Sequence, residues 1–203
     1  MISSILLAAG ESARMKGGNK LTKEINGVPI VKYAIKNILG SSVDELIIVL
    51  GHENEIIENI IEKNKKIKFI YNKNYKNGIS TSIQIGIKNV SKKMEAFFIS
   101  LGDMPDVNQN IYNKIIKTRY NYNKKLKANL KKEIFIPTFE GKKGNPILFS
   151  KHMVEKIMQI KDDNGAKELI ELIELNKDKT LIVPLKSRGV TLDFNKQEDF
   201  ISS

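Results

Sequence analysis

The hydrophobic positions of this chain fall into two kinds of segment that alternate along the sequence. Short runs of apolar residues are typical of buried strands, whereas apolar residues that recur every three or four positions are typical of helices. We expect strands at residues 3–8, 45–50, 68–71, 96–100, 134–139, 146–149, 181–185 and 190–192. We expect helices from near Pro29, at 54–63, 81–90, 151–160 and 165–175, and after a capping box at 106–109. This alternation predicts an α/β fold with a mainly parallel sheet.

The length and continuity of the pattern predict a single domain spanning residues 1–203, because 203 residues can bury a sizeable core and no repeat or linker interrupts them. No apolar run approaches the ~18 residues that a membrane helix needs. The amino terminus begins as a strand without a basic leader. We therefore expect a cytoplasmic protein that has no membrane partner.

The residue composition narrows the possible chemistry. Hydrophobic residues make up 41% and charged residues 28% of the chain, which is typical of a globular protein. The chain has no cysteine, so thiolate catalysis and cysteine-based metal sites are excluded. His52 and His152 are far apart in sequence. Any metal should therefore be a hard cation held by oxygen ligands.

The net charge of +11 is carried almost entirely by lysine and favours anionic ligands, nucleic acid among them. The lysines are densest at residues 114–132, where Ile115, Ile116 and Tyr120 recur at helical spacing. We interpret this stretch as a solvated helix face and loop rather than a nucleic-acid patch. The lack of an aromatic stacking array also argues against a nucleic-acid partner.

The stretch most informative about function is residues 6–20, where a short apolar strand runs into a loop with three glycines and two cations. Glycines let the backbone approach an anion, and Arg14 and Lys20 offer a planar fork and a point charge for phosphoryl oxygens. Neither G-x-G-x-x-G nor G-x-x-x-x-G-K-[ST] is present. The loop predicts a phosphate site of another design; the alternative is an ordinary βα turn with solvated cations.

In open parallel sheets, ligands bind beyond the carboxyl ends of the strands, where the winding direction reverses. We therefore expect the site at the loops after the strands that end at Ala8 and Ser100. The second loop presents Asp103, which could hold a divalent cation or bond its own backbone in a turn. Asp106 is explained as a helix N-cap. Asp193 is the second candidate metal ligand, with a strand-end cap as its alternative role.

Two further loops should lie at the same sheet edge. In residues 77–82, hydroxyl groups could read a base or sugar, or cap the following helix. We expect capping to account for one of Ser80 and Thr81, which leaves Ser82 less constrained. Residues 141–146 form a cationic, glycine-bearing turn suited to a second phosphate-bearing substrate, or alternatively a plain hairpin turn.

Several motifs occur together in a definite order. They are Leu-Ala-Ala-Gly-x-Ser-x-Arg-Met at 7–15, Lys20, Gly-x-Ser-x-Ser at 78–82, Leu-Gly-Asp-Met-Pro at 101–105, Gly-Asn-Pro at 144–146, Asp-x-Gly-Ala at 163–166, and Asp-x-Asn at 193–195 with Glu198 and Asp199. This combination resembles the molybdenum cofactor nucleotidyltransferases, most of all the molybdopterin cytidylyltransferase branch.

The resemblance implies a Rossmann-like three-layer fold of the nucleotide-diphospho-sugar transferase type. It implies magnesium-dependent transfer of a nucleotide from an NTP, with CTP favoured, to the terminal phosphate of molybdopterin or molybdenum cofactor, with pyrophosphate released. A molybdenum hydroxylase is the implied protein partner. The resemblance implies that Ala9 and Gly10 lie against the base and phosphates, that Arg14 and Lys20 hold the triphosphate, and that Asp103 holds magnesium. It also implies Ser82 for the base and Gly144, Asn145 and Pro146 for the pterin side. Together with the candidates taken from the residues themselves, the predicted site comprises Arg14, Lys20 and Asp103 for catalysis, Asp103 and Asp193 for the metal, and Ala8, Ala9, Gly10, Ser80, Ser82, Gly144, Asn145 and Pro146 for substrates.

The chain departs from the family pattern in three places. The segment from Arg14 to Lys20 is one residue longer, Asn145 replaces a histidine, and Lys167 replaces an arginine. An amide is not a protonatable partner, and lysine offers a point charge instead of a bidentate fork. The alternatives are a nucleotidyltransferase that uses GTP or another NTP, one with a sugar-phosphate or phospholactate acceptor, and a non-catalytic NTP-binding accessory protein for molybdoenzymes.

Overall fold

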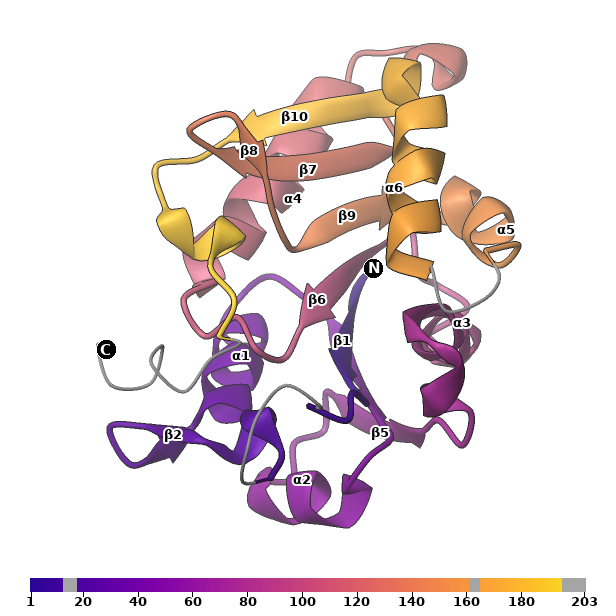
Figure 1. Cartoon of the computed structure of the whole chain (residues 1–203). Helices are drawn as coiled ribbons and strands as arrows, with labels where there is room; N and C mark the ends of the chain where they lie inside the picture. The colour runs from indigo at the N-terminus through magenta and orange to yellow at the C-terminus, as the bar shows by residue number, and fades with distance from the viewer. Residues whose placement is uncertain (13–17, 161–164, 195–203) are drawn as a thin grey trace.

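The structure, a computed structural model, describes residues 1–12, 18–160 and 165–194. The predictions for Arg14, for the motif at Asp163, and for Asn195, Glu198 and Asp199 lie outside these residues. Within the described residues, eight strands form one sheet in the order β10-β7-β9-β6-β1-β4-β5, with β8 paired to β7 (Figure 1). Their bounds are β1 (Ile2–Ala8), β4 (Glu45–Leu50), β5 (Ile67–Tyr71), β6 (Ala96–Leu101), β7 (Ile134–Phe139), β8 (Lys142–Lys143), β9 (Ile147–Ser150) and β10 (Thr180–Pro184).

The sheet is mostly parallel, as the sequence pattern predicts. Strand β9 runs antiparallel to both β6 and β7, and the short β8 runs antiparallel to β7, whereas the other strands run in one direction. Six helices accompany the sheet in the described part of the chain: α1 (Ile30–Leu39), α2 (Asn54–Ile60), α3 (Ile79–Asn89), α4 (Gln109–Asn123), α5 (Val154–Ile157) and α6 (Gly165–Leu175). None of the helices described is long and apolar enough to cross a membrane.

The helices cover both faces of the sheet and complete a three-layer fold (Figure 1). Helices α1, α2 and α4 pack on the face that carries Leu6, Ile48 and Phe98. Helices α3, α5 and α6 pack on the opposite face, with Ile5 and Phe97. Successive residues of β1 and β6 enter opposite cores, so these central strands are apolar on both faces, which is the pattern expected of a buried parallel sheet.

Three predicted features near the sheet edge are wrong in detail. The strand predicted at 190–192 is replaced by a 3-10 helix, η6 (Arg188–Thr191), whose Gly189 N–H donates a capping hydrogen bond to the Ser187 hydroxyl. The helix predicted at 151–160 is the 3-10 helix η4 (Lys151–Met153) followed by the short α5. The N-cap of α4 is Asn108, whose side chain accepts two backbone hydrogen bonds, and not Asp106.

A small hairpin was not predicted from the hydrophobic pattern. Strands β2 (Glu24–Ile25) and β3 (Val28–Pro29) pair in antiparallel fashion around Asn26 and Gly27, which have φ angles of 51° and 74°. Positive φ at both central residues, together with the Asn-Gly sequence, is typical of a tight two-residue hairpin turn. The strands are too short to give an alternating apolar signal, so the turn residues were the available clue.

The contact between α3 and β1 generates a prediction about stability. A Cβ atom at Gly86 would overlap Cγ2 of the buried, β-branched Ile5. Although alanine favours helices over glycine by up to ~1 kcal/mol, we expect Gly86→Ala to lower the free energy of unfolding by ~1–3 kcal/mol, because overpacking outweighs helix propensity. Urea denaturation measures this change. Lys88→Ala, on the exposed face of α3, is the matched control; a stabilised Gly86→Ala protein would contradict the packing described here.

Candidate active site

The site lies where the winding direction of the sheet reverses. From β1 the chain moves outward through β4 to β5, and then returns to β6 on the other side of β1. Leu7 pairs with Leu101, so the loops that follow β1 and β6 leave the sheet side by side. A cavity of about 280 Å³ opens between them. This is the location predicted from the strands that end at Ala8 and Ser100.

The structure brings most of the predicted donor-side residues to this cavity. Its lining includes Ala8, Ala9, Gly10, Lys20, Ser82 and Asp103. A larger cavity of about 580 Å³ lies between α1 and the start of β5, away from the carboxyl ends of β1 and β6. We assign the site to the smaller cavity because it combines the sheet reversal, the glycine loop and a cation–carboxylate pair.

An ion pair between Lys20 and Asp103 joins the two loops. The Lys20 ammonium donates a hydrogen bond to the Asp103 carboxylate, and the two side chains are only 21% and 13% exposed. A pair that is shielded from water interacts more strongly than a solvated surface pair. A cation and a carboxylate are thus held together in the wall of one cavity, at the point where the winding direction of the sheet reverses.

The loop after β1 is held by its own polar side chains. The Ser12 hydroxyl accepts a hydrogen bond from the Lys20 backbone N–H at 3.0 Å. The Asn19 side chain accepts one from the Leu21 N–H at 3.0 Å and so caps the 3-10 helix η1 (Lys20–Thr22). These two contacts fix the backbone of Lys20, which explains why its side chain lies in the cavity.

At Gly51, directly after β4, the backbone lies close to the loop that follows β1. A Cβ atom at Gly51 would lie 2.7 Å from both the Ala9 carbonyl oxygen and Tyr75 Cβ, so only glycine fits at this position. The His52 N–H donates a hydrogen bond to the Ala9 carbonyl at 3.2 Å. Tyr75 and Lys76 of the 3-10 helix η2 (Tyr75–Asn77) therefore reach the cavity, where Lys76 forms an ion pair with Glu11 at 3.7 Å.

The hydroxyl groups before and within α3 are arranged differently from the prediction. The N-cap position is Gly78, and Thr81 lies inside the helix with its hydroxyl near the Gly78 carbonyl at 2.9 Å. Ser80 is buried and does not line the cavity. Neither side chain caps the helix, so that expectation is wrong.

Ser82 is held in place by a residue that the sequence reasoning did not single out. The side-chain amide of Asn72, which is 3% exposed, donates hydrogen bonds to the hydroxyls of Ser82 and Thr81, each at 2.9 Å. The Asn72 side-chain oxygen accepts a hydrogen bond from the Asn74 N–H at 3.0 Å. Asn72 follows β5 directly, so the strand-end rule that led to the other loops could have indicated it.

The predicted pterin-side residues lie at the same edge of the sheet but outside this cavity. Because Ile147 pairs with Ile99, the antiparallel β9 places Gly144, Asn145 and Pro146 near the carboxyl end of β6. The Asn145 N–H donates to the Val190 carbonyl at 2.8 Å. A Cβ at Gly144 would overlap the same carbonyl group, so glycine permits this close approach.

Asp193 lies on a segment that touches the Asp103 loop. The N–H of the next residue, Phe194, donates a hydrogen bond to the Asp103 backbone carbonyl at 3.0 Å. The described residues contain no group of three or more histidine, aspartate or glutamate side chains that could hold a metal. Magnesium needs only one or two protein carboxylates when phosphates and water supply the other oxygens. Asp103 and Asp193 remain the predicted ligands.

The fold and the cavity at its reversal point are those expected of a nucleotidyltransferase, and the comparisons with known proteins show that this is the class of the chain. The MobA-like NTP transferase domain matches residues 4–180, and the chain belongs to this family. The chain is 25% identical over 202 residues to the molybdenum cofactor cytidylyltransferase of Escherichia coli strain K12, covering all of this chain and 95% of that protein. It is 26% identical over 183 residues to the bifunctional protein GlmU of Aquifex aeolicus, covering 87% of this chain and 35% of that protein.

Solved structures share the fold at low sequence identity. A nucleotidyl transferase from Methanothermobacter thermautotroptrophicus superposes with a TM-score of 0.81 at 19% identity, over 100% of this chain and 95% of the other. Rv0371c from Mycobacterium tuberculosis H37Rv, crystallised with manganese, superposes with a TM-score of 0.77 at 17% identity, over 99% and 96%. The predicted family and the predicted nucleotide-diphospho-sugar transferase type of fold are both confirmed.

The Asn72 contacts predict a measurable loss of stability. Asn72→Ala would leave the buried Ser82 hydroxyl without this donor, and we expect the free energy of unfolding to fall by ~1–3 kcal/mol. Asn121→Ala, at an exposed position of α4, is the control and should change stability by less than about 0.5 kcal/mol. If urea denaturation gave the same loss of unfolding free energy for both substitutions, the structural role assigned to Asn72 would be contradicted.

Proposed function

We propose that the protein transfers CMP from CTP to the terminal phosphate of molybdopterin or molybdenum cofactor, with magnesium, and releases pyrophosphate. The observation that carries this proposal is the Lys20–Asp103 pair in the cavity at the reversal point of the sheet. The choice of nucleotide and acceptor is supported by the Escherichia coli relative, which is named for this activity and aligns over nearly its full length.

The reaction needs positioning more than acid–base chemistry. An oxygen of the acceptor phosphate attacks the α-phosphorus of the NTP, a new phosphorus–oxygen bond forms, and the bond from the α-phosphorus to the bridging oxygen breaks as pyrophosphate leaves. The acceptor phosphate is already ionised, so no general base is required. Catalysis then depends on alignment and on neutralising the charge that develops. This suits a cavity whose described lining contains neither histidine nor cysteine.

Lys20 is proposed to hold the triphosphate. Its ammonium has three donor hydrogens, so the contact with Asp103 leaves donors for phosphoryl oxygens. The backbone at Gly10 carries no side chain, and nothing lies within 4 Å of the place that a Cβ would occupy, so an anion can come close to the main chain there. Arg14 is proposed to add a second cation from the same loop.

The oxygen donors fit a divalent cation. Asp103 supplies a carboxylate inside the cavity, and Asp193 lies beside the residue that hydrogen-bonds to the Asp103 backbone. When bound, magnesium would neutralise negative charge on the phosphate oxygens. The manganese complex of the structural neighbour Rv0371c is consistent with a divalent ion in this fold.

Ser82 is proposed to contact the base. Its hydroxyl oxygen accepts from Asn72, so its own proton can be donated to an acceptor atom, and cytosine offers such atoms on its ring edge. Ala8 and Ala9 are small, which leaves space for a flat ring against the end of β1. On the acceptor side, the proposal keeps Gly144, Asn145 and Pro146, which lie beyond the Asp103 loop at the same sheet edge.

The first test removes the proposed metal-binding carboxylate. Asp103→Asn should lower the rate of pyrophosphate release by at least ~10²-fold, because charge stabilisation at the reacting phosphate is lost. The control is Asp106→Asn, which changes an exposed aspartate three residues further along the same loop and should retain activity. Circular dichroism verifies that both variants fold. Near-normal turnover by Asp103→Asn would refute the role assigned to this carboxylate.

The second test asks which nucleotide is the donor. A ligand that binds only the native state raises the melting temperature, so CTP with magnesium should raise it more than GTP, UTP or ATP. A larger rise with GTP would instead support the alternative, a nucleotidyltransferase that uses GTP. Pyrophosphate release with molybdopterin, compared with sugar phosphates and phospholactate, then identifies the acceptor. If no acceptor yields pyrophosphate although CTP binds, the protein is an accessory NTP-binding protein.

A further inference from the structure

A second cavity, with a strongly basic lining, lies at the opposite edge of the sheet. It has a volume of about 500 Å³ and is placed at the amino ends of β6, β7 and β10, whereas the active site lies at the carboxyl ends. Its lining contains six cationic side chains, a histidine and two carboxylates: Arg119, Lys131, Lys132, Lys151, Lys156, Lys179, His152, Glu95 and Glu133. The sheet itself separates this basic cavity from the active site.

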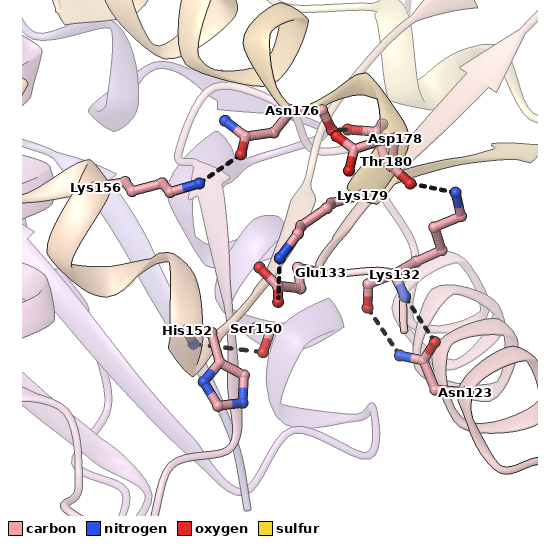
Figure 2. A network of polar contacts seen from close by, with 10 residues as sticks. All are labelled: Asn123, Lys132, Glu133, Ser150, His152, Lys156, Asn176, Asp178, Lys179 and Thr180. Carbon is pink, nitrogen blue, oxygen red and sulfur yellow. Dashed lines mark hydrogen bonds and ion pairs between the residues drawn. The ribbon is translucent and has the colours of Figure 1, made fainter. Parts of the chain in front are cut away.

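The walls of the basic cavity are fixed by a polar network (Figure 2). The side chain of Asn123, at the end of α4, exchanges two hydrogen bonds with the backbone of Lys132, at 2.8 and 2.9 Å. The Lys156 ammonium donates to the Asn176 side chain at 2.6 Å, which ties α5 to the end of α6. Lys179 and Glu133 form an ion pair at 3.3 Å. These contacts connect the segments that line the basic cavity.

The two carboxylates do not neutralise the basic cavity. Glu133 is already paired with Lys179, and Glu95 lies 3.8 Å from the amino-terminal ammonium. In the part of the chain that the structure describes, the side chains of Lys131 and Lys151 form neither a hydrogen bond nor an ion pair. Two exposed cations of the lining thus have no partner of opposite charge among the described residues.

Arg119 adds a partly buried cation to the lining of the basic cavity. Its Nε atom is buried and makes no hydrogen bond with any described residue. A buried donor without an acceptor costs free energy. Burial lowers the pKa of Arg119, and the charge of Glu95 opposes this shift only as the smaller effect. A negative charge bound in the basic cavity would act in the same direction as Glu95 and favour the charged guanidinium.

We propose that the basic cavity binds a small, multiply charged phosphate compound, of the size of a nucleotide or an inorganic polyphosphate. Its volume lies within the ~300–1,000 Å³ of small-molecule sites. Converging lysines and an arginine suit phosphoryl oxygens. A nucleic acid is disfavoured because the lining contains no aromatic side chain apart from His152 on which bases could stack. The proposal is independent of the function assigned to the active site.

The two histidines of the chain allow both cavities to be observed in one experiment. His152 lines the basic cavity, while the His52 ring lies 6.2 Å from the ring of Tyr75, which lines the active site. Histidine ring NMR signals are followed while tripolyphosphate is added to the full chain without divalent metal at physiological ionic strength. We expect a saturable shift of the His152 signal.

Two double variants distinguish binding in the basic cavity from a general effect of the net charge. The double variant Lys131→Gln, Lys151→Gln should raise the tripolyphosphate concentration that half-saturates the His152 shift by about tenfold, because two ion pairs of ~0.7 kcal/mol each are lost. Both lysines are exposed, so the variant should fold. Lys65→Gln with Lys125→Gln changes the net charge equally, at exposed positions outside the lining, and should leave the response intact.

Three outcomes would overturn the proposal: no saturable His152 shift, equal weakening by both lysine pairs, or a response to an RNA oligonucleotide with none to tripolyphosphate. The last outcome would assign the surface to nucleic acid. A failure of the proposed active site would be seen separately, as a His52 signal that does not respond to CTP with magnesium.

Discussion

The structure depends most on the parallel pairing of β1 with β6. This register sets Leu7 beside Leu101 and makes the loops after the two strands neighbours, although more than ninety residues of chain separate them. Both strands are buried on both faces, so a shift of one residue would exchange the side chains that enter the two cores. The cores therefore fix the register, and the register brings Lys20 and Asp103 into one cavity. The positions of the site residues at the sheet edge are thus a consequence of how the two hydrophobic cores pack.

Several segments then converge on the Asp103 loop and hold it. Lys20 contacts its carboxylate, Phe194 hydrogen-bonds to its backbone, and η6 packs against Asp106, where a Cβ at Gly189 would overlap the carbonyl group. Helix η6 also contacts Asn145 through Val190. One short 3-10 helix therefore connects the loop proposed to bind metal with the turn proposed to bind the acceptor. Such rigid support is what a reaction that relies on alignment requires.

The sequence pattern was sufficient for the frame of the fold and for the place of the cavity. Long apolar runs predicted the central strands, and the strand-end rule predicted the loops after Ala8 and Ser100. The errors lie where tertiary packing decides local structure: residues 190–192 resemble a strand, yet the Ser187 cap and the close contact at Gly189 fold this segment as η6. The strand-end rule indicates the place of Asn72, directly after β5, but its role depends on two hydroxyls that only the fold brings to its side chain.

The two ends of the sheet thus differ in charge: the carboxyl edge has a cation–carboxylate pair, and the amino edge has an excess of cations. Our central claim is that the carboxyl-edge cavity holds the reacting triphosphate. A crystal structure with magnesium and a non-hydrolysable CTP analogue tests it directly. We expect the triphosphate between the Gly10 backbone and Lys20, with the metal on the Asp103 carboxylate. A nucleotide bound elsewhere, or a metal without contact to Asp103, would contradict the claim.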